Sequence, residues 1–489
     1  STKIKVFILL LSLFTISLAH GNYKCTHDEK EHPKPEFHDI EEVGFPAIED
    51  SSRLLTTYPN IRMTGHYDYL SSNLSSYMSN YVGPAVISYF QSALTVKYPV
   101  ATKLIFTGST VCSETTPAVL KTGVTTDFFI MWVDEYDQPA SATASVWVAD
   151  SYACYLSTTS KRPLIAKTLI NSAVFVDPGT NVLLHEKNIY MIMHEMTHTL
   201  GFTQDLYPYF IDDTGKTLTG HILTGTLDGS TSTVIDVAPL ATRLRSFFGC
   251  SNLTGAYMEN SGSSATAGSH FERRQFAFEA MTSGLIYQQA YSQFSLAMLE
   301  GSGWYVPNYT MADPYWFGQG EGCNFLFQSC SASGFTFPEF CTGSSRGCSV
   351  TGRGGGFCQS DIRSDNCEFV HPDVNYDCDN TDASTYARLP TLQAFGRTSY
   401  SKCFEGTLSS TTTTSATSFC FKYACSGSGI NTKLTVTVGS TNLTCTQAGS
   451  MSVTGYKGYI TCPDPLTFCS TVGAPVCPRG CMGRGTCVN

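Results

Sequence analysis

The sequence predicts an α+β fold, followed by a disulfide-rich C-terminal region made mostly of β structure and loops. Segments rich in aromatic and β-branched residues, such as TTDFFIMWVDEY (residues 125–136), precede one long helical pattern that ends near residue 201. Sixteen of the twenty cysteines then lie between Cys323 and Cys487. The first part of the chain must therefore depend on a hydrophobic core, and the second part on disulfide bonds.

The composition excludes two classes of protein. Hydrophobic residues make up 42% of the 489 residues and charged residues only 14%, which excludes a mainly disordered chain and supplies cores for two or three domains. The formal net charge is −10 and no run of basic residues occurs, so we expect no nucleic-acid partner.

The N-terminus has the pattern of a secretory signal peptide. Lys3 and Lys5 precede an apolar block, and small residues follow it near residue 19. The alternative is an uncleaved signal anchor. The twenty cysteines agree with an oxidising compartment, so we predict a secreted or cell-surface protein. Four sequons mark candidate glycosylation sites at Asn73, Asn252, Asn308 and Asn442.

The elements before residue 202 follow from local patterns. A polar, acidic stretch after the signal peptide is typical of a pro-segment. Residues 80–100 predict an amphipathic helix that runs into a loop, and residues 142–156 and 168–178 predict strands. The next helix is expected to start after Pro178-Gly179 and to end at Gly201, which suits a C-terminal cap. Residues 271–305 resume helical spacing, with a break at 282–284.

The segment HEMTHTLG carries a metal-binding pattern. His194 and His198 stand four residues apart, so a helix places both imidazoles on one face, about 5–6 Å apart at Cβ. In zinc proteases the carboxylate at the position of Glu195 acts as the general base and does not bind the metal. Gly201 matches the glycine of the longer metzincin pattern, but Gln204 stands where that pattern has its third histidine.

Three histidines after residue 198 are candidates for the third ligand: His221, His270 and His371. His371 lies among the cysteines, away from the predicted catalytic half. His270 has a better setting than His221, because small residues precede it and Met281 follows in a Met-Thr-Ser-Gly turn. A methionine in a turn beneath the metal is the second mark of metzincins.

Several motifs together resemble the leishmanolysin family of surface metalloproteases. They are HEMTHTLGF, a long insertion, GSH, EAM, WFGQGEGCNFLFQSC and GYITCPDPLTFC, and they extend over roughly residues 60 to 470. The resemblance implies a metzincin-type zinc protease catalytic domain split by an insertion. It also implies one Zn²⁺ per chain held by His194, His198 and His270, with Glu195 as catalytic base and Met281 as the Met-turn residue.

The predicted organisation has six parts. They are a signal peptide (1–19), a pro-segment (20–55), an N-terminal catalytic subdomain with the HExxH helix (56–202), a region with the insertion, third zinc ligand and Met-turn (203–322), a cysteine-rich C-terminal domain (323–470) and an incomplete EGF-like module (471–489). We expect further sequence to follow this module. Whether the protein is membrane-anchored stays open.

The resemblance also implies disulfides Cys112–Cys154 and Cys250–Cys323, and twelve cysteines from Cys330 to Cys469 then remain to close among themselves. Leishmanolysins are similar in carrying a pro-segment cysteine, here Cys25. Because a thiolate binds zinc strongly, Cys25 is a candidate inhibitory residue of a zymogen. The alternative is that Cys25 pairs with the tail or with another chain.

The predicted function is a zinc metalloendopeptidase that hydrolyses peptide bonds in proteins. Its partners are protein or peptide substrates, with extracellular or host surface proteins as further candidates and an unknown oligomeric state. Two alternatives come from other classes: a catalytically silent adhesion protein on the same scaffold, and a structural cysteine-rich surface protein.

Overall fold

The computed structural model describes most of the chain. The described residues are 23–24, 32–43, 58–138, 146–227, 229–260, 268–284, 287–330, 337–343, 346–380, 401–409 and 418–471. The predicted signal peptide, Cys25 and nearly all of the predicted EGF-like module lie outside these ranges.

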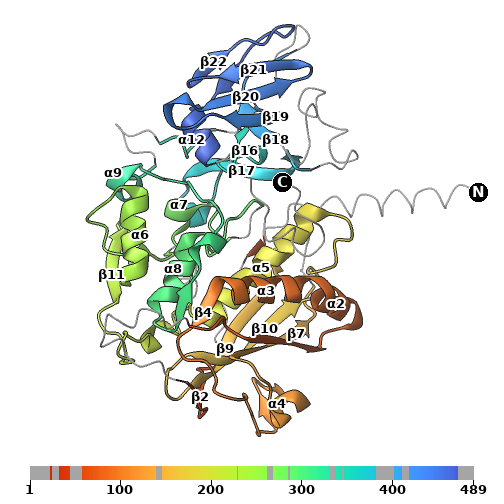
Figure 1. Cartoon of the computed structure of the whole chain (residues 1–489), viewed down its shortest axis with the longest axis vertical. Coiled ribbons are helices and arrows are strands. Elements are labelled where there is room, and N and C mark those ends of the chain that lie inside the picture. The colour runs from red at the N-terminus through yellow and green to blue at the C-terminus, as the bar shows by residue number, and fades with distance from the viewer. Residues whose placement is uncertain are drawn as a thin grey trace, which may run out of the picture.

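A five-stranded sheet forms the base of the first half of the molecule (Figure 1). Its strand order is β2 (Glu36–His38), β9 (Ala149–Ser157), β10 (Pro163–Asn171), β7 (Phe128–Glu135) and β3 (Met63–Tyr69). Strands β10, β7 and β3 run parallel, whereas β9 is antiparallel to β10. Strand β7 reads FFIMWV and is buried over these six residues, as expected for a strand covered on both faces.

Helices cover one face of this sheet and loops cover the other. Helix α5 (Val182–Leu200) packs on β9 and β10, and α3 (Gly83–Ala93) packs on β3 and on α5. The opposite face is closed by residues 98–124, which include α4 (Ala118–Thr122) and bury a second apolar cluster around Leu104 and Phe129 (Figure 1). Helix α5 is therefore enclosed by protein along almost its whole length.

Most predicted elements of this half are confirmed, and two are partly wrong. Helix α3 confirms the helix predicted in segment 80–100, but strand β4 (Leu94–Val96) follows it where a loop was predicted. The predicted strand 168–178 ends early, because β10 stops at Asn171. The Asn171 side chain accepts from the Ala173 amide at 3.1 Å and donates to the Trp147 carbonyl at 3.0 Å, which turns the chain out of the sheet.

The described part of the predicted pro-segment pairs with later strands at two places, of which one lies in this sheet and the other in a separate two-stranded sheet. Strand β2 pairs in parallel with β9, and β1 (Tyr23–Lys24) pairs in parallel with β8 (Val146–Trp147). His32 Nε2 lies 3.0 Å from the buried Asp150 carboxylate, and Glu42 accepts from Ser157 Oγ at 2.7 Å. Residues 32–43 thus complete the edge of the sheet beside β9.

The region after α5 folds back onto the first half. A hairpin of β11 (Ile222–Leu227) and β12 (Ser230–Ile235) pairs with β13 (Ala256–Tyr257), and α6 (Ala238–Phe248) packs on α8 (Gln293–Gly301). Strand β14 (Tyr305–Pro307) then pairs antiparallel with β4. One hydrophobic core consequently extends from Ile61 to Phe369 and joins both sides of α5.

The helical expectation for residues 271–305 is only partly met. Helix occurs at α7 (Arg273–Phe276) and α8, whereas residues 277–284 and 287–292 are irregular. Phe278 has a φ of 70°, which a helix does not accommodate, and the backbone of residues 278–282 makes tertiary hydrogen bonds instead. Tertiary contacts override the helical spacing here.

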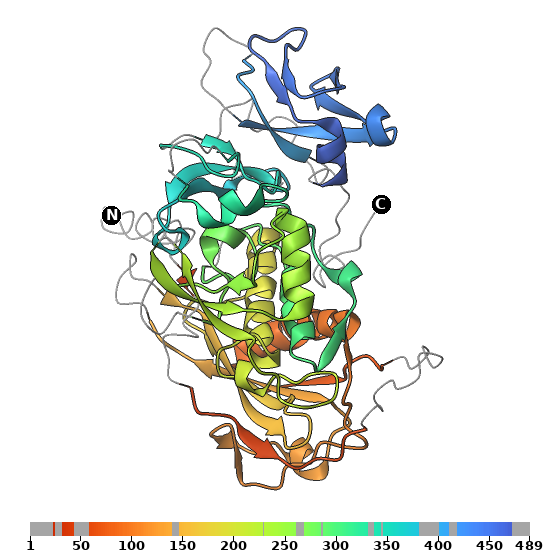
Figure 2. The same ribbon diagram turned by 90° about the vertical axis from the view of Figure 1, so that its left-hand side faces the viewer.

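The remaining elements are short or belong to the C-terminal region, which forms separate sheets above the first half of the molecule (Figure 2). The short elements before residue 330 are α2 (Ser72–Tyr77), the π-helix Met78–Val82, β5 (Thr110–Val111), β6 (Glu114–Thr115) and α9 (Gly322–Phe327), with 3₁₀ turns at Tyr207–Tyr209 and Tyr309–Met311. The later elements are β15 (Arg346–Cys348), β16 (Gly354–Ser360), β17 (Glu368–Asp377), β18 (Ser401–Glu405), β19 (Ser418–Ser426), β20 (Lys433–Val438), β21 (Thr441–Cys445), β22 (Gly449–Met451), β23 (Ile460–Cys462) and α12 (Pro465–Ser470), with 3₁₀ turns at Ile362–Ser364 and Gly429–Asn431.

The predicted disulfides are confirmed. Cys112 pairs with Cys154 and Cys250 with Cys323. The twelve cysteines from Cys330 to Cys469 close among themselves as 330–367, 341–358, 348–403, 378–420, 425–469 and 445–462. A separate apolar cluster is formed by the elements from β18 to α12, so the C-terminal region has a small hydrophobic core in addition to its disulfides.

An ion pair joins α5 to this C-terminal region. The Arg353 guanidinium, between β15 and β16, donates to both oxygens of Glu186 at 2.5 and 2.7 Å. Asp379 lies 3.7 Å from the same guanidinium. A bidentate pair with little solvent exposure fixes both the position and the orientation of its two elements.

We expect Arg353→Met to lower the free energy of unfolding by about 3 kcal/mol, because it leaves the Glu186 carboxylate without its bidentate partner. Urea titration of the full chain measures this change. Lys433→Met, which removes an exposed cation from β20, is the matched control and should stay within about 0.5 kcal/mol of wild type. Equal stability of the two variants would contradict a structural role for the pair.

Candidate metal centre

The two histidines of the HExxH pattern lie on the last turns of α5. Asn181 caps the start of the helix by accepting from the Leu184 amide at 3.0 Å, and Gly201 ends it with hydrogen bonds to the carbonyls of Thr197 and His198. This fulfils the predicted boundary at Gly201. Because the helix is regular between its caps, the residues four apart project from one face.

His270 reaches the same place from the far end of the insertion. The residues just after α5 form hydrogen bonds with the two residues before His270. The Gln204 amide donates to Ser269 Oγ at 3.1 Å, and Tyr207 Oη donates to the Gly268 carbonyl at 3.0 Å. Gln204 therefore supports the loop that carries His270. The backbone of the residue at the third-histidine position of the metzincin pattern thus contacts the residue before His270.

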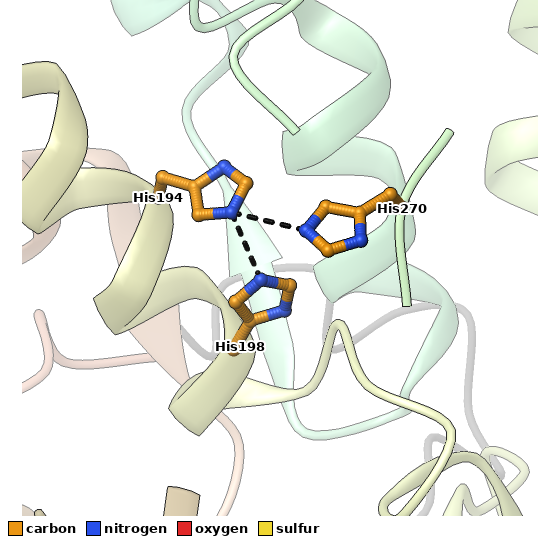
Figure 3. Close-up of side chains that lie close together, drawn as sticks. All are labelled: His194, His198 and His270. Atoms are coloured by element: carbon orange, nitrogen blue, oxygen red, sulfur yellow. Dashed lines mark hydrogen bonds between the residues drawn. The ribbon is translucent and has the colours of Figure 1, made fainter. Parts of the chain in front are cut away.

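The three imidazoles converge (Figure 3). His194 Nε2 lies 3.0 Å from His198 Nε2 and 3.2 Å from His270 Nε2, and all three side chains are buried. Among the described residues, no other group of three His, Cys, Asp or Glu side chains has ligand atoms that all lie within 4.8 Å of one another. His221 and His371, the other candidates, do not take part.

The outer nitrogen of two of these rings is held by a backbone carbonyl. His194 Nδ1 lies 2.6 Å from the Ala280 oxygen, and His198 Nδ1 lies 2.7 Å from the Phe202 oxygen. A carbonyl can only accept, so Nδ1 carries the proton in each ring and Nε2 carries the lone pair. Both lone pairs then point into the space shared with His270.

Burial keeps His194 neutral. Burial is the largest cause that lowers the pKa of His194, and the neighbouring His270 lowers it further. The hydrogen bond to the Ala280 carbonyl raises the pKa, and the net result is a pKa of about 3. A neutral imidazole with a free Nε2 lone pair is the form that binds a divalent cation. The ring is therefore ready to act as a ligand well below neutral pH.

The donor set suits zinc. Two lone pairs only 3.0 Å apart repel each other unless a proton or cation lies between them. Zinc with tetrahedral bonds of 2.0–2.1 Å places neighbouring nitrogens about 3.3 Å apart, close to the separations seen here. Three buried imidazoles, two of them with carbonyl-bound Nδ1 atoms, have the composition of a three-protein-ligand zinc site.

Met281 lies in a tight turn next to this group. The Thr282 amide and hydroxyl both donate to the Glu279 carbonyl, at 3.3 and 2.9 Å, which closes the turn. Met281 is fully buried in the main core. Its preceding residue, Ala280, supplies the carbonyl that holds His194. The left-handed φ of Phe278 shows that this loop is held away from its relaxed backbone conformation.

The other histidine candidates have different surroundings. His221 is buried, stacks on Phe210 and contacts the Tyr207 carbonyl through Nε2 at 2.9 Å. His371 stacks on Phe369 in the C-terminal region. Burial lowers the pKa of both rings, to about 4 for His371. Both therefore serve as packed aromatic side chains.

Comparison with known proteins identifies the family. The family model described as Leishmanolysin matches residues 60–359, which is more than half of the chain. The chain belongs to the leishmanolysin family. Relatives include a leishmanolysin-like peptidase of Caenorhabditis elegans, 26% identical over 61% of this chain and 56% of that protein. A leishmanolysin homolog of Crithidia fasciculata is 23% identical over 83% of this chain and 65% of that protein. The ciliated left-right organizer metallopeptidase of Danio rerio is 27% identical over 71% of this chain and 56% of that protein.

The chain spans less than two thirds of the length of each of these leishmanolysin relatives. Two of the relatives are named as peptidases or metallopeptidases, and a metallopeptidase family implies a metal cofactor. The match to the leishmanolysin model covers α5, the insertion and His270, so the group of three histidines lies wholly within it.

The sequence did not reveal the groups that hold the histidine rings. The carbonyls of Ala280 and Phe202 carry no side-chain signal, and only the position of Phe202 just beyond the helix cap hints at its role. Glu279 could have been noticed as a lone carboxylate in the apolar stretch FAFEAM. Of the remaining predicted sites, Cys25 lies outside the described residues, and the sequon asparagines Asn73, Asn252, Asn308 and Asn442 are all exposed.

Proposed function

We propose that this protein is a secreted or cell-surface zinc metalloendopeptidase that hydrolyses peptide bonds in proteins. The observation that carries the proposal is the convergence of three Nε2 atoms, from His194, His198 and His270, in a buried site where carbonyls fix the tautomers of two rings. Membership of the leishmanolysin family supports it. The site takes one Zn²⁺ per chain, held by these three histidines.

Each residue of the site has a distinct part in the proposed reaction. When bound, zinc supplies a Lewis acid that polarises the peptide carbonyl and makes water a nucleophile at neutral pH. Glu195, buried beside the ligands on α5, accepts the proton of the attacking water. The protonated Glu195 carboxyl then delivers this proton to the departing amine. Met281 forms the apolar floor of the site and binds no substrate atom.

The location and modifications are proposed from the sequence. The pattern of residues 1–19 and the eight disulfides of the described chain support export to an oxidising compartment. The four exposed sequon asparagines are proposed glycosylation sites. In the part of the chain that the structure describes, no helix is both long enough and apolar enough to cross a bilayer.

The test is metal analysis of the purified protein combined with cleavage of a casein-type substrate. A zinc metalloendopeptidase contains about one zinc per chain and cleaves the substrate, and removal of the metal by a chelator abolishes cleavage. Zinc without cleavage would instead favour the silent adhesion protein. A protein without zinc would favour the structural cysteine-rich alternative and overturn the proposal.

We further propose that Cys25 keeps the uncleaved protein inactive, because a thiolate is a strong zinc ligand and blocks the position that the attacking water needs. Pairing of β1, which ends one residue before Cys25, with β8 supports a docked pro-segment. Cys25→Ser, or treatment of wild type with a mercurial, should yield activity before any cleavage of the chain. A Cys25→Ser protein as inactive as the uncleaved wild type would leave steric blockage by residues 20–55 as the explanation.

A further inference from the structure

A buried carboxylate lies behind the turn that carries Met281. Glu279 is fully enclosed, and four donors converge on its two oxygens. Oε1 accepts from the Ser292 amide at 3.1 Å, from Ser292 Oγ at 2.9 Å and from Ser295 Oγ at 2.7 Å. Oε2 accepts from the Met281 amide. A single side chain thus joins the Met281 turn to the N-terminal end of α8.

The α8 end of this connection is rigid. Ser292 is the N-cap of α8 and accepts from the Phe294 amide at 3.0 Å, so the donors to Oε1 belong to the first turn of a packed helix. A carboxylate is favoured there by the exposed amides and by the helix dipole. Burial raises the pKa of Glu279 to about 7, and each of the four donors opposes this rise.

The turn end of the connection touches both sides of the metal site through the backbone. The Ala280 carbonyl holds His194 Nδ1 at 2.6 Å. The Met281 carbonyl accepts from the Phe271 amide at 2.9 Å, and Phe271 directly follows His270. A shift of the two peptide groups after Glu279 would therefore move the acceptor of one ligand and the backbone beside another.

We propose that Glu279 is a positioning residue for the metal site, which locates His194 and His270 by anchoring residues 280–281 to α8. This inference rests on the proposed function. Glu279 touches neither substrate nor metal in this role. It acts through the Ala280 carbonyl on the orientation of the His194 ring, and through the Met281 carbonyl on the backbone next to His270.

Glu279→Gln separates the two ends of this connection. The amide oxygen of the glutamine can accept from the same three donors of α8. Its NH₂ group then faces the Met281 amide, and because both groups are donors, only the hydrogen bond at the turn is lost. Ser295→Ala is the matched control, because it removes one donor on the α8 side and leaves the bond to Met281 in place.

The readout is the dissociation constant of zinc, measured on the metal-free full chain by competition with a chromophoric chelator. We expect zinc binding by Glu279→Gln to be about 10–100-fold weaker, the usual effect of losing a group that orients a ligand. Ser295→Ala should bind zinc as wild type does. With saturating zinc, kcat of Glu279→Gln should fall while KM stays unchanged, since the site distorts without losing substrate contacts.

The possible outcomes separate this inference from the proposed function. Wild type that binds no zinc overturns both. Wild type that binds zinc, together with a folded Glu279→Gln that binds it equally well, overturns only the positioning role. If Glu279→Gln does not fold, Glu279→Asp carries the same expectation, because its shorter side chain cannot reach both α8 and Met281. If neither variant folds, the proposal is also wrong, since Glu279 is then required for the fold itself.

Discussion

Glu195→Gln should retain its zinc and lose about 10²–10⁴-fold in kcat for peptide hydrolysis, the contribution expected of a general base. The glutamine has the same shape as the glutamate, so the buried helix is undisturbed, but it cannot accept and return a proton near neutral pH. The loss corresponds to about 3–5 kcal/mol of transition-state stabilisation. Zinc content and steady-state cleavage of a protein substrate, measured on the same sample, check this result.

The control for this experiment lies on the same helix. Glu186 is also a buried glutamate of α5, but it is tied to Arg353 in the C-terminal region and is not part of the site. Glu186→Gln should therefore lower stability and leave kcat per folded molecule unchanged. Loss of zinc from Glu195→Gln would show that this carboxylate has a structural or ligand role. Full activity of Glu195→Gln would remove it from the mechanism.

The sequence predicted those parts of the fold that depend on local patterns. Helix α5 was predicted to start after Pro178-Gly179 and to end at Gly201, and in the structure Asn181 and Gly201 cap it through hydrogen bonds to neighbouring residues. Strand β7 follows from its run of aromatic and branched residues. By contrast, residues 277–284 and 287–292 have helical spacing and are irregular, because the Met281 and Ala280 carbonyls accept from the Phe271 amide and the His194 ring instead of from a following helical turn. No local pattern carries that information.

The polar residues of the predicted pro-segment also make long-range contacts that the local sequence pattern did not reveal. The acidic stretch around Glu42 suggests a solvated segment when it is seen alone. In the structure the Glu42 side chain is buried among hydroxyl groups that are more than a hundred residues away in sequence, and its carboxylate lies 3.5 Å from the buried Arg162 guanidinium. Long-range charge pairing of this kind turns a polar segment into a sheet edge, and a single sequence does not reveal it.

For the candidate metal site, the sequence predicted three histidines that the structure brings together, but not the groups that hold them. His194, His198 and Glu195 follow from spacing on one helix. His270 required the joint pattern of the insertion, the preceding small residues and Met281. The supporting contacts come from backbone carbonyls and from Glu279, whose role depends on the distant N-terminus of α8. A sequence motif indicates which side chains can form the site, whereas the orientation of these side chains depends on contacts made in the folded chain.

His270→Ala should lose most of its bound zinc and, with it, peptide hydrolysis. His270 supplies one of three converging Nε2 atoms, and without it two imidazoles remain to hold the ion. The loss in affinity should exceed the roughly 10–100-fold effect of removing a group that merely orients a ligand. Chelator competition measures the affinity, and zinc analysis after dialysis measures occupancy.

His221→Ala is the matched control, because His221 is also a buried histidine of the insertion but contacts the Tyr207 carbonyl instead of the metal site. It should keep its zinc. The reverse pattern, with zinc lost from His221→Ala and retained by His270→Ala, would show that the insertion delivers a different ligand. Gln204→Ala gives a third comparison: because its backbone amide, not its side chain, bonds Ser269, zinc affinity should change far less than in His270→Ala. A loss as large as that of His270→Ala would place the Gln204 side chain among the ligands.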